Sequence, residues 1–325
     1  MSGDPQLALP GLISDGAAEW VWCEESEEVT DETAFDHQAV MKREVVAALD
    51  PCESGLYLDA TLGRGGHALG LLEAGAGKLV GIDRDEAALR ATKRRLQAFS
   101  ERVTLVHSNF AAVGEALAQV GIECVDGACA DLGVSSPQLD DATRGMSFRR
   151  EGPIDMRMDL SQGETALDLI DQLSDDGLAD VLYRFGEEHR SRRIARSIKR
   201  AMADGELKTT IDLRRAIVRA VGPVRVGGVD PATRTFQALR IAVNGELDEL
   251  TTLLETLERL VTPGGVVAIL SFHSLEDRIV KRAFNDSAAW EPLWKKPRVA
   301  SDDETAENPR SRSAKLRAAR RSHEK

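Results

Sequence analysis

The sequence has no hydrophobic run long enough to cross a membrane and no cysteine spacing typical of a metal site. Its longest apolar stretches, such as residues 266–270, are far shorter than the roughly 20 residues of a membrane-spanning helix. The four cysteines show neither Cys-x-x-Cys spacing nor a histidine partner, which argues against zinc and favours a reducing compartment. The chain begins without a basic segment followed by an apolar one, so no secretory signal is expected. We therefore expect a cytoplasmic protein with no membrane or metal partner.

Acidic residues outnumber basic residues by 54 to 42, but the two kinds are unevenly distributed. The net charge of −12 argues on its own against a nucleic-acid partner. Residues 1–36, however, contain ten acidic residues and no lysine or arginine, which leaves a net charge of only −2 on the rest. Residues 184–200 and 310–325 contain seven basic residues each. A near-neutral body with basic patches is compatible with RNA, although a solvated helix face would explain either patch alone.

Strand-like and helix-like segments alternate through residues 56–131. Helices separate short buried strands that are expected at 56–60, 78–83, 102–107 and 125–131. Such alternation predicts a mostly parallel sheet with helices on both faces. It stops at residues 138–230, which have helical periodicity without a strand, and resumes with a strand at 266–272. We therefore expect an α/β fold with an inserted all-helical domain.

This organisation divides the chain into four parts. Residues 37–137 and 231–300 are expected to form the sheet domain, and residues 138–230 the helical insert. Residues 1–36 have too few large apolar side chains to offset the entropy of ordering them, which predicts a disordered acidic extension. The polar and basic residues 301–325 are expected to form a partly disordered tail.

A glycine-rich segment after the first strand of the alternation is the clearest candidate for a cofactor site. Residues 59–67 read Asp-Ala-Thr-Leu-Gly-Arg-Gly-Gly-His, and glycines there let backbone N–H groups approach a ligand closely. Asp83 ends the next strand, where a carboxylate can accept hydrogen bonds from ribose hydroxyls. The spacing Gly63-x-Gly65-x-x-Ala68 also matches the dinucleotide pattern. A nicotinamide oxidoreductase and a non-catalytic nucleotide-binding protein are therefore alternatives.

Three features favour S-adenosylmethionine over a dinucleotide. Asp59 opens the loop, where an acid can meet the ammonium group of the methyl donor but would repel a pyrophosphate. Residues 108–110 follow the third strand, where a polar and an aromatic side chain can border an adenine ring. The turn at residues 263–265 before an apolar strand is common in methyltransferases. We therefore expect an S-adenosylmethionine-dependent methyltransferase.

Longer motifs follow in a defined order. They are Asp131-Leu-Gly-Val-Ser-Ser-Pro-Gln-Leu-Asp140, Asp155-Met-Arg-Met158, Phe272-His-Ser-Leu-Glu-Asp-Arg278 and Asn308-Pro-Arg-Ser-Arg-Ser313. With these motifs the chain resembles, from about His37 to Arg317, the bacterial 16S ribosomal RNA cytosine N(4)-methyltransferase family, called MraW or RsmH. The resemblance implies a Rossmann-like class I methyltransferase with an inserted helical domain that binds RNA. Its substrate would be the exocyclic amine of a decoding-centre (P-site) cytidine in 16S ribosomal RNA, within the small ribosomal subunit.

The resemblance also implies which residues form the site. The cofactor contacts fall on Gly65, Gly66, His67, Asp83, Phe110, Asp131 and Gln138. Asp131, at the end of the fourth strand, is the first candidate for a catalytic role as the acceptor that holds the amine, with cofactor binding alone as the alternative. His273 is the second candidate, as a contact to the base or a phosphate, unless Glu276 or Asp277 satisfies it.

Direct in-line methyl transfer is the expected mechanism, because no cysteine follows a proline in the pattern used for carbon methylation of pyrimidines. Each of six arginines is expected either to contact RNA phosphates or to pair with a nearby acid. These are Arg144, Arg149, Arg157, Arg234, Arg240 and Arg278.

Overall fold

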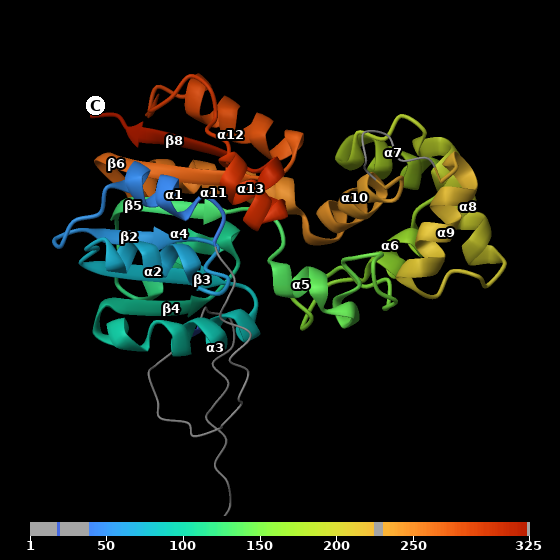
Figure 1. Cartoon of the computed structure of the whole chain (residues 1–325), viewed down its shortest axis with the longest axis horizontal. Helices are drawn as coiled ribbons and strands as arrows, with labels where there is room; N and C mark the ends of the chain where they lie inside the picture. The colour runs from blue at the N-terminus through green and yellow to red at the C-terminus, as the bar shows by residue number, and fades with distance from the viewer. Residues whose placement is uncertain (1–17, 20–38, 224–229, 324–325) are drawn as a thin grey trace, which may run out of the picture.

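The computed structural model describes residues 18–19, 39–223 and 230–323, which form a sheet domain and a separate helical body (Figure 1). In this part of the chain one sheet has the strand order β1-β4-β3-β2-β5-β6-β8-β7. Its strands are β1 (Ala18–Glu19), β2 (Leu56–Asp59), β3 (Lys78–Asp83), β4 (Val103–His107), β5 (Val125–Asp131), β6 (Val261–Ser271), β7 (Trp290–Pro292) and β8 (Lys315–Arg321). All neighbouring strands in the series β4-β3-β2-β5-β6 run parallel to one another. Strands β1 and β8 pair antiparallel with β4 and β6, and β7 pairs antiparallel with β8.

The helices lie in the connections between the strands and in the helical body. They are α1 (Lys42–Leu49), α2 (Gly66–Glu73), α3 (Glu86–Arg95), α4 (Val113–Gln119), α5 (Ser136–Asp140), α6 (Ala166–Gln172), α7 (Asp175–Gly186), α8 (Ser191–Ala203), α9 (Thr210–Val221), α10 (Thr233–Asn244), α11 (Glu246–Leu260), α12 (Ser274–Asp286) and α13 (Asp302–Glu307). Among the described residues no helix is both long and apolar enough to span a membrane.

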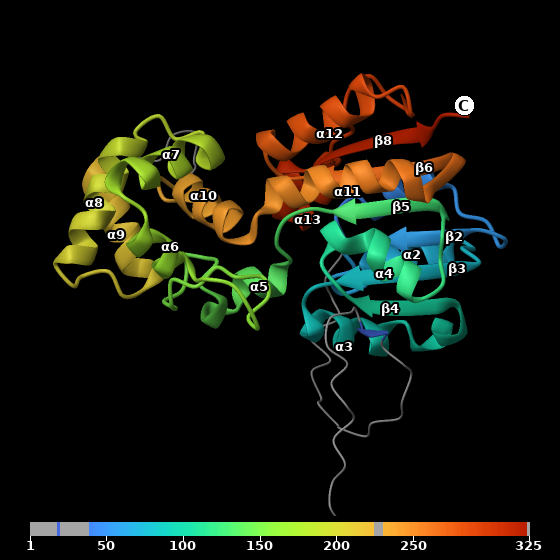
Figure 2. The same cartoon turned by 180° about the vertical axis from the view of Figure 1, so that it is seen from behind.

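The central strands are buried on both faces. Leu79 and Leu105 contribute to one core, which also contains apolar side chains of α1, α2 and α3. Their neighbours Val80 and Val106 belong to a second core, which they share with α4, α11 and α12. Helix α11 lies in front of the sheet in Figure 2. Strands buried on both faces need nearly continuous apolar runs, which is why they could be recognised in the sequence. The predicted α/β fold with helices on both faces of a mostly parallel sheet is confirmed.

The helical body has a core of its own. Side chains of α6 to α10 form it, together with Ile154 and Met156 from the segment that precedes α6. Phe236 and Leu239 of α10 belong to this core, so the helical body extends beyond residue 230, where the sequence placed its end. Residues 224–229, near that predicted boundary, lie outside the described part of the chain.

The prediction of a partly disordered tail is wrong for residues 301–323. They form α13, a 3₁₀ turn at Pro309–Ser313 and β8, which lies between β6 and β7 in the sheet. Leu316 of β8 is fully buried, and Arg317 donates from Nε to Oδ1 of Asp277 at 2.6 Å. The segment is basic in composition, but its charges meet partners from distant parts of the chain. The predicted acidic extension lies outside the described residues, except for residues 18–19.

Candidate active site

The glycine loop between β2 and α2 is packed so closely that a side chain would not fit at two of its positions. Gly63 and Gly65 have φ values of 51° and 71°, in the left-handed region that glycine adopts without strain. A Cβ on Gly65 would lie 2.6 Å from Cγ2 of Thr92, and one on Gly66 would lie 2.7 Å from Cβ of Ala39. The Thr92 hydroxyl also donates to the carbonyl oxygen of Gly63 at 2.7 Å. Helix α3 and the segment before α1 therefore hold the loop in one shape.

Asp83, the last residue of β3, ties the loop down from the other side. Its Oδ2 accepts from the N–H of Gly63 at 2.7 Å, and its Oδ1 accepts from the N–H of Asp85 at 2.8 Å. Burial raises the pKa of Asp83, although both N–H groups oppose the shift. Each carboxylate oxygen has a second lone pair. Asp83 can therefore accept further hydrogen bonds from a ligand while it positions the loop.

His67 and Asp131 meet where the neighbouring strands β2 and β5 end. Nε2 of His67 lies 3.6 Å from Oδ2 of Asp131. Among the described residues no hydrogen-bond partner reaches either ring nitrogen of His67, Oδ1 of Asp131 or Oδ2 of Asp59, all of them buried atoms. Buried polar atoms without partners are costly in a folded protein, so their clustering indicates the place of a ligand.

The pKa values of Asp59 and His67 are both raised, and each depends on the charge of the other residue. Burial raises the pKa of Asp59 to about 6. Burial lowers the pKa of His67, but the carboxylates of Asp131 and Asp59 outweigh it, so that the pKa is raised overall. The two carboxylates therefore stabilise the protonated form of the imidazole.

Phe110 begins a 3₁₀ turn after β4, and Gln138 lies on the short helix α5 after β5. The guanidinium carbon of Arg84 lies 5.1 Å from the centroid of the Phe110 ring, and Arg84 itself pairs with Glu249. Gln138 donates from Nε2 to Oδ2 of Asp85 at 3.3 Å and accepts from the N–H of Ser135 at 3.0 Å. Gln138 thus connects the loop after β5 with the loop after β3, a role that its position in the sequence did not suggest.

A cleft of about 970 Å³ opens between these strand ends and the helical body. Seven of the eight cofactor-binding and catalytic residues proposed from the sequence line it: Gly66, His67, Asp83, Phe110, Asp131, Gln138 and His273. Gly65 does not line the cleft but packs against Thr92. The opposite wall includes Phe148 and Phe236, whose rings meet edge to face with centroids 5.1 Å apart. Residues 307–310 also line the cleft, so the tail contributes to the site.

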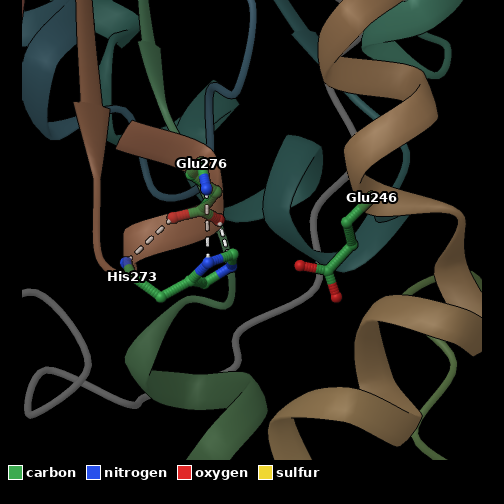
Figure 3. Close-up of side chains that lie close together, drawn as sticks. All are labelled: Glu246, His273 and Glu276. Atoms are coloured by element: carbon green, nitrogen blue, oxygen red, sulfur yellow. Dashed lines mark hydrogen bonds and ion pairs between the residues drawn. The ribbon is translucent and has the colours of Figure 1, made fainter. Parts of the chain in front are cut away.

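His273 is the N-cap residue of α12, and Glu276 folds back onto it from the first turn (Figure 3). Nδ1 of His273 accepts from the N–H of Glu276 at 3.4 Å, and Nε2 lies 3.0 Å from Oε1 of Glu276. Oε2 of Glu276 accepts from the N–H groups of Phe272 and His273, at 2.8 and 3.3 Å. Asp277, the other partner considered, pairs with Arg317 instead. Both ring nitrogens of His273 therefore face Glu276.

Glu246 lies beside this pair, and the ligand atoms of Glu246, His273 and Glu276 are within 4.8 Å of one another (Figure 3). That spacing suits a metal ion. Arg240, however, donates from Nε and Nη2 to the two oxygens of Glu246, each at 2.8 Å. The bidentate arginine thus occupies both oxygens of Glu246, which a metal would need as ligands. The donor set therefore fits a buried ion-pair network better than a metal centre.

Five of the six arginines proposed as phosphate contacts have partners within the protein. The partners are Asp85 for Arg144, Asp155 for Arg157, Glu246 for Arg240, Glu187 for Arg278 and the Glu187 carbonyl for Arg234. The Arg149 guanidinium has no partner among the described residues and lines the cleft. Arg149 is therefore the one of the six that is best placed to meet a phosphate there.

Comparisons with known proteins cover both the sheet domain and the helical body. The model of the MraW methylase family matches residues 34–322. Ribosomal RNA small subunit methyltransferase H of Sorangium cellulosum (strain So ce56) is 64% identical over 285 residues, which cover 88% of this chain and 90% of that relative. The protein of the same name from Synechococcus elongatus is 48% identical over 291 residues, covering 89% and 96%. The one from Deinococcus deserti is 47% identical over 295 residues, covering 91% and 96%. The chain belongs to the MraW methylase family.

Proposed function

We propose that the protein transfers a methyl group from S-adenosylmethionine to the N(4) amine of a decoding-centre cytidine in 16S ribosomal RNA. Family membership supports this activity, since the relatives are named ribosomal RNA small subunit methyltransferase H. The observation that carries the proposal is the group of unpartnered buried atoms of His67 and Asp131, which lies where parallel strands end at the cleft. The family match leaves the nicotinamide alternative without support.

The residues around the glycine loop fit the methyl donor. Gly66 and His67 would hold its methionine portion, Asp83 its ribose and Phe110 its adenine, while Gln138 keeps the neighbouring loops in place. Gly65 would act by keeping the loop in shape. The donor supplies an electrophilic methyl group on a sulfonium. The protein then chiefly has to align nitrogen, methyl and sulfur, an orientation effect that can supply much of the rate enhancement.

A carboxylate can assist the acceptor amine beyond this alignment. Its lone pair is delocalised into the cytosine ring, and the nitrogen must lose one proton when it gains the methyl group. A carboxylate that accepts a hydrogen bond from one N–H favours the pyramidal nitrogen of the transition state and can take up the proton. Asp131 lines the cleft. Its Oδ1 is buried and has no hydrogen-bond partner among the described residues. We assign this role to Asp131.

His273 was the second candidate for a catalytic role. Because both of its ring nitrogens face Glu276, its contacts favour positioning of the loop after β6 over proton transfer. His273 lines the cleft, so the edge of its ring is available to a bound base.

The helical body would guide the RNA. It forms the wall of the cleft opposite the glycine loop, where Arg149 is available to a phosphate and Phe148 to a base. A cytidine in single-stranded ribosomal RNA costs less to splay into such a cleft than a paired one. The proposed partner is therefore 16S ribosomal RNA in the small ribosomal subunit, and the proposed compartment is the cytoplasm.

The test is methyl transfer by the purified protein to small ribosomal subunits that lack the modification. We expect nucleoside mass spectrometry to detect N(4)-methylcytidine only when S-adenosylmethionine is supplied. Unmodified cytidine at every cofactor concentration would indicate a binding factor without catalytic activity. Saturable binding of NAD, with none of S-adenosylmethionine, would overturn the cofactor assignment.

A further inference from the structure

One side of helix α8 carries a row of arginines. This α8 arginine face consists of four exposed residues, Arg192, Arg193, Arg196 and Arg200. Because successive residues of a helix are turned by about 100°, the four side chains emerge within about 100° of one another. The other side of the helix carries the buried residues Ser191, Ile194, Ala195, Ile198 and Ala201. The helix is therefore packed into the body by one side, and the other side presents these four arginines together with Ala203 at the end of the helix.

The side chains of the α8 arginine face have no acidic partner within the part of the chain that the structure describes. Arg196 donates from Nε only to a backbone carbonyl, that of Arg192, at 3.3 Å. Exposed arginines on the adjacent helix α9 are neutralised instead: Arg215 pairs with Asp212 and Arg219 with Glu206, both at 2.9 Å. In a chain with a net charge of −12, four uncompensated arginines on one helix face indicate an anionic partner.

The α8 arginine face is held in a fixed position. Nζ of Lys199 donates to the carbonyls of Ile170 and Asp171, both at 3.0 Å, and Oγ of Ser197 donates to the carbonyl of Ala216 at 2.7 Å. Arg192, Arg196 and Arg200 follow one another at four-residue spacing, which puts their Cβ atoms about 6 Å apart. This spacing is comparable to that of successive phosphates along one strand of RNA.

Two exposed rings lie shortly before the α8 arginine face in the chain. Tyr183, near the end of α7, is 56% exposed, and its ring meets that of His189 with centroids 6.3 Å apart. His189 lies in the short connection that leads into α8. Exposed aromatic rings beside arginines provide stacking surfaces for unpaired RNA bases. This combination favours RNA over an acidic protein as the anionic partner.

We propose that the α8 arginine face binds the phosphate backbone of small-subunit ribosomal RNA at a second contact, outside the active-site cleft. None of its residues lines the cleft, and α8 lies on the side of the helical body away from the sheet (Figures 1 and 2). The contact holds the enzyme on the subunit while the cleft takes up the target cytidine. This inference rests on the proposed function, which supplies ribosomal RNA as the substrate.

The test compares two triple variants of the full-length protein. The first, Arg192→Gln/Arg196→Gln/Arg200→Gln, removes three charges of the α8 arginine face. The control, Arg90→Gln/Arg215→Gln/Arg219→Gln, removes the same charge from exposed arginines that are already paired with acids. Binding to purified small ribosomal subunits is measured over a range of salt concentrations, and thermal unfolding verifies that both variants fold.

Three lost phosphate contacts should reduce the slope of log K against log salt by about 2 to 3. We expect this reduction, and a raised KM for subunits with kcat unchanged, in the first variant but not in the control. Equal slopes in the wild type and the first variant, or equal losses in both variants, would overturn the inference. Wild-type protein that binds subunits through these arginines without methylating them would leave the inference standing and refute the proposed function.

Discussion

Substitution of Gly65 by alanine tests whether the glycine loop is as tightly held as the structure indicates. An alanine would have to adopt φ near 71°, which costs about 1–2 kcal/mol. Its Cβ would also lie 2.6 Å from Cγ2 of Thr92, and overpacking of this kind costs about 1–3 kcal/mol. Gly65→Ala should therefore lower the free energy of unfolding by about 2–5 kcal/mol, measured by chemical denaturation. It should also weaken S-adenosylmethionine binding in calorimetry, because the loop must shift.

Two further variants separate the backbone strain from the steric clash. Gly121 has φ of 73°, and a Cβ there would have no neighbouring atom within 4 Å, so Gly121→Ala should cost only the strain, about 1–2 kcal/mol. Thr92→Ser removes Cγ2 but keeps the hydroxyl that donates to Gly63. The pair Gly65→Ala/Thr92→Ser should be less destabilised than the sum of its single changes by about 1–3 kcal/mol. Equal costs at Gly65 and Gly121, with no rescue by Thr92→Ser, would refute the packing argument.

Three other changes test the site and the fold. Asp131→Asn should lower the rate of methyl transfer by about a hundredfold or more, with a much smaller change in cofactor affinity; wild-type turnover would remove the proposed acceptor role. Asp59 is buried and its pKa rises from about 4 when unfolded to about 6, so its ionisation costs stability as pH rises through that window. Asp59→Asn should therefore gain stability over the wild type between pH 4 and pH 7, by up to about 3 kcal/mol, and a difference independent of pH would contradict the assignment. Leu316→Ala should cost about 2–5 kcal/mol in denaturation because Leu316 is fully buried, whereas Arg320→Ala, at an exposed position of the same strand, should cost less than about 1 kcal/mol.

The parallel strands could be predicted because they are buried on both faces and read as short apolar runs. The strand β8 could not, because its sequence Lys-Leu-Arg-Ala-Ala-Arg-Arg looks like a solvated basic segment. Its charges are compensated by contacts that no local pattern reveals, such as the one between Arg317 and Asp277, forty residues away. The composition of this segment therefore did not reveal that it is ordered.

Most of the candidate site could be placed from the sequence because ligands bind where parallel strands end, and Asp83 and Asp131 are such ends. The pair of Arg240 and Glu246 could not be foreseen. Gly245, with φ of 61°, ends α10 and begins α11, and this break turns Glu246 back towards Arg240. The pairing depends on the direction in which the chain leaves one helix, which residue types alone do not specify.

The position of β8 has a consequence for the order in which the protein can assemble during synthesis. The strand lies between β6 and β7, so this edge of the sheet is incomplete until residues 315–321 have left the ribosome. Near the other end of the described chain, the N–H of Met41 donates to Oε1 of Glu304 at 2.6 Å, a contact that spans 263 residues. Contacts between such distant segments form late and slow the folding of a domain. The nascent chain therefore exposes the outer edge of β6 from the time residue 271 has emerged until residues 315–321 emerge and pair with it.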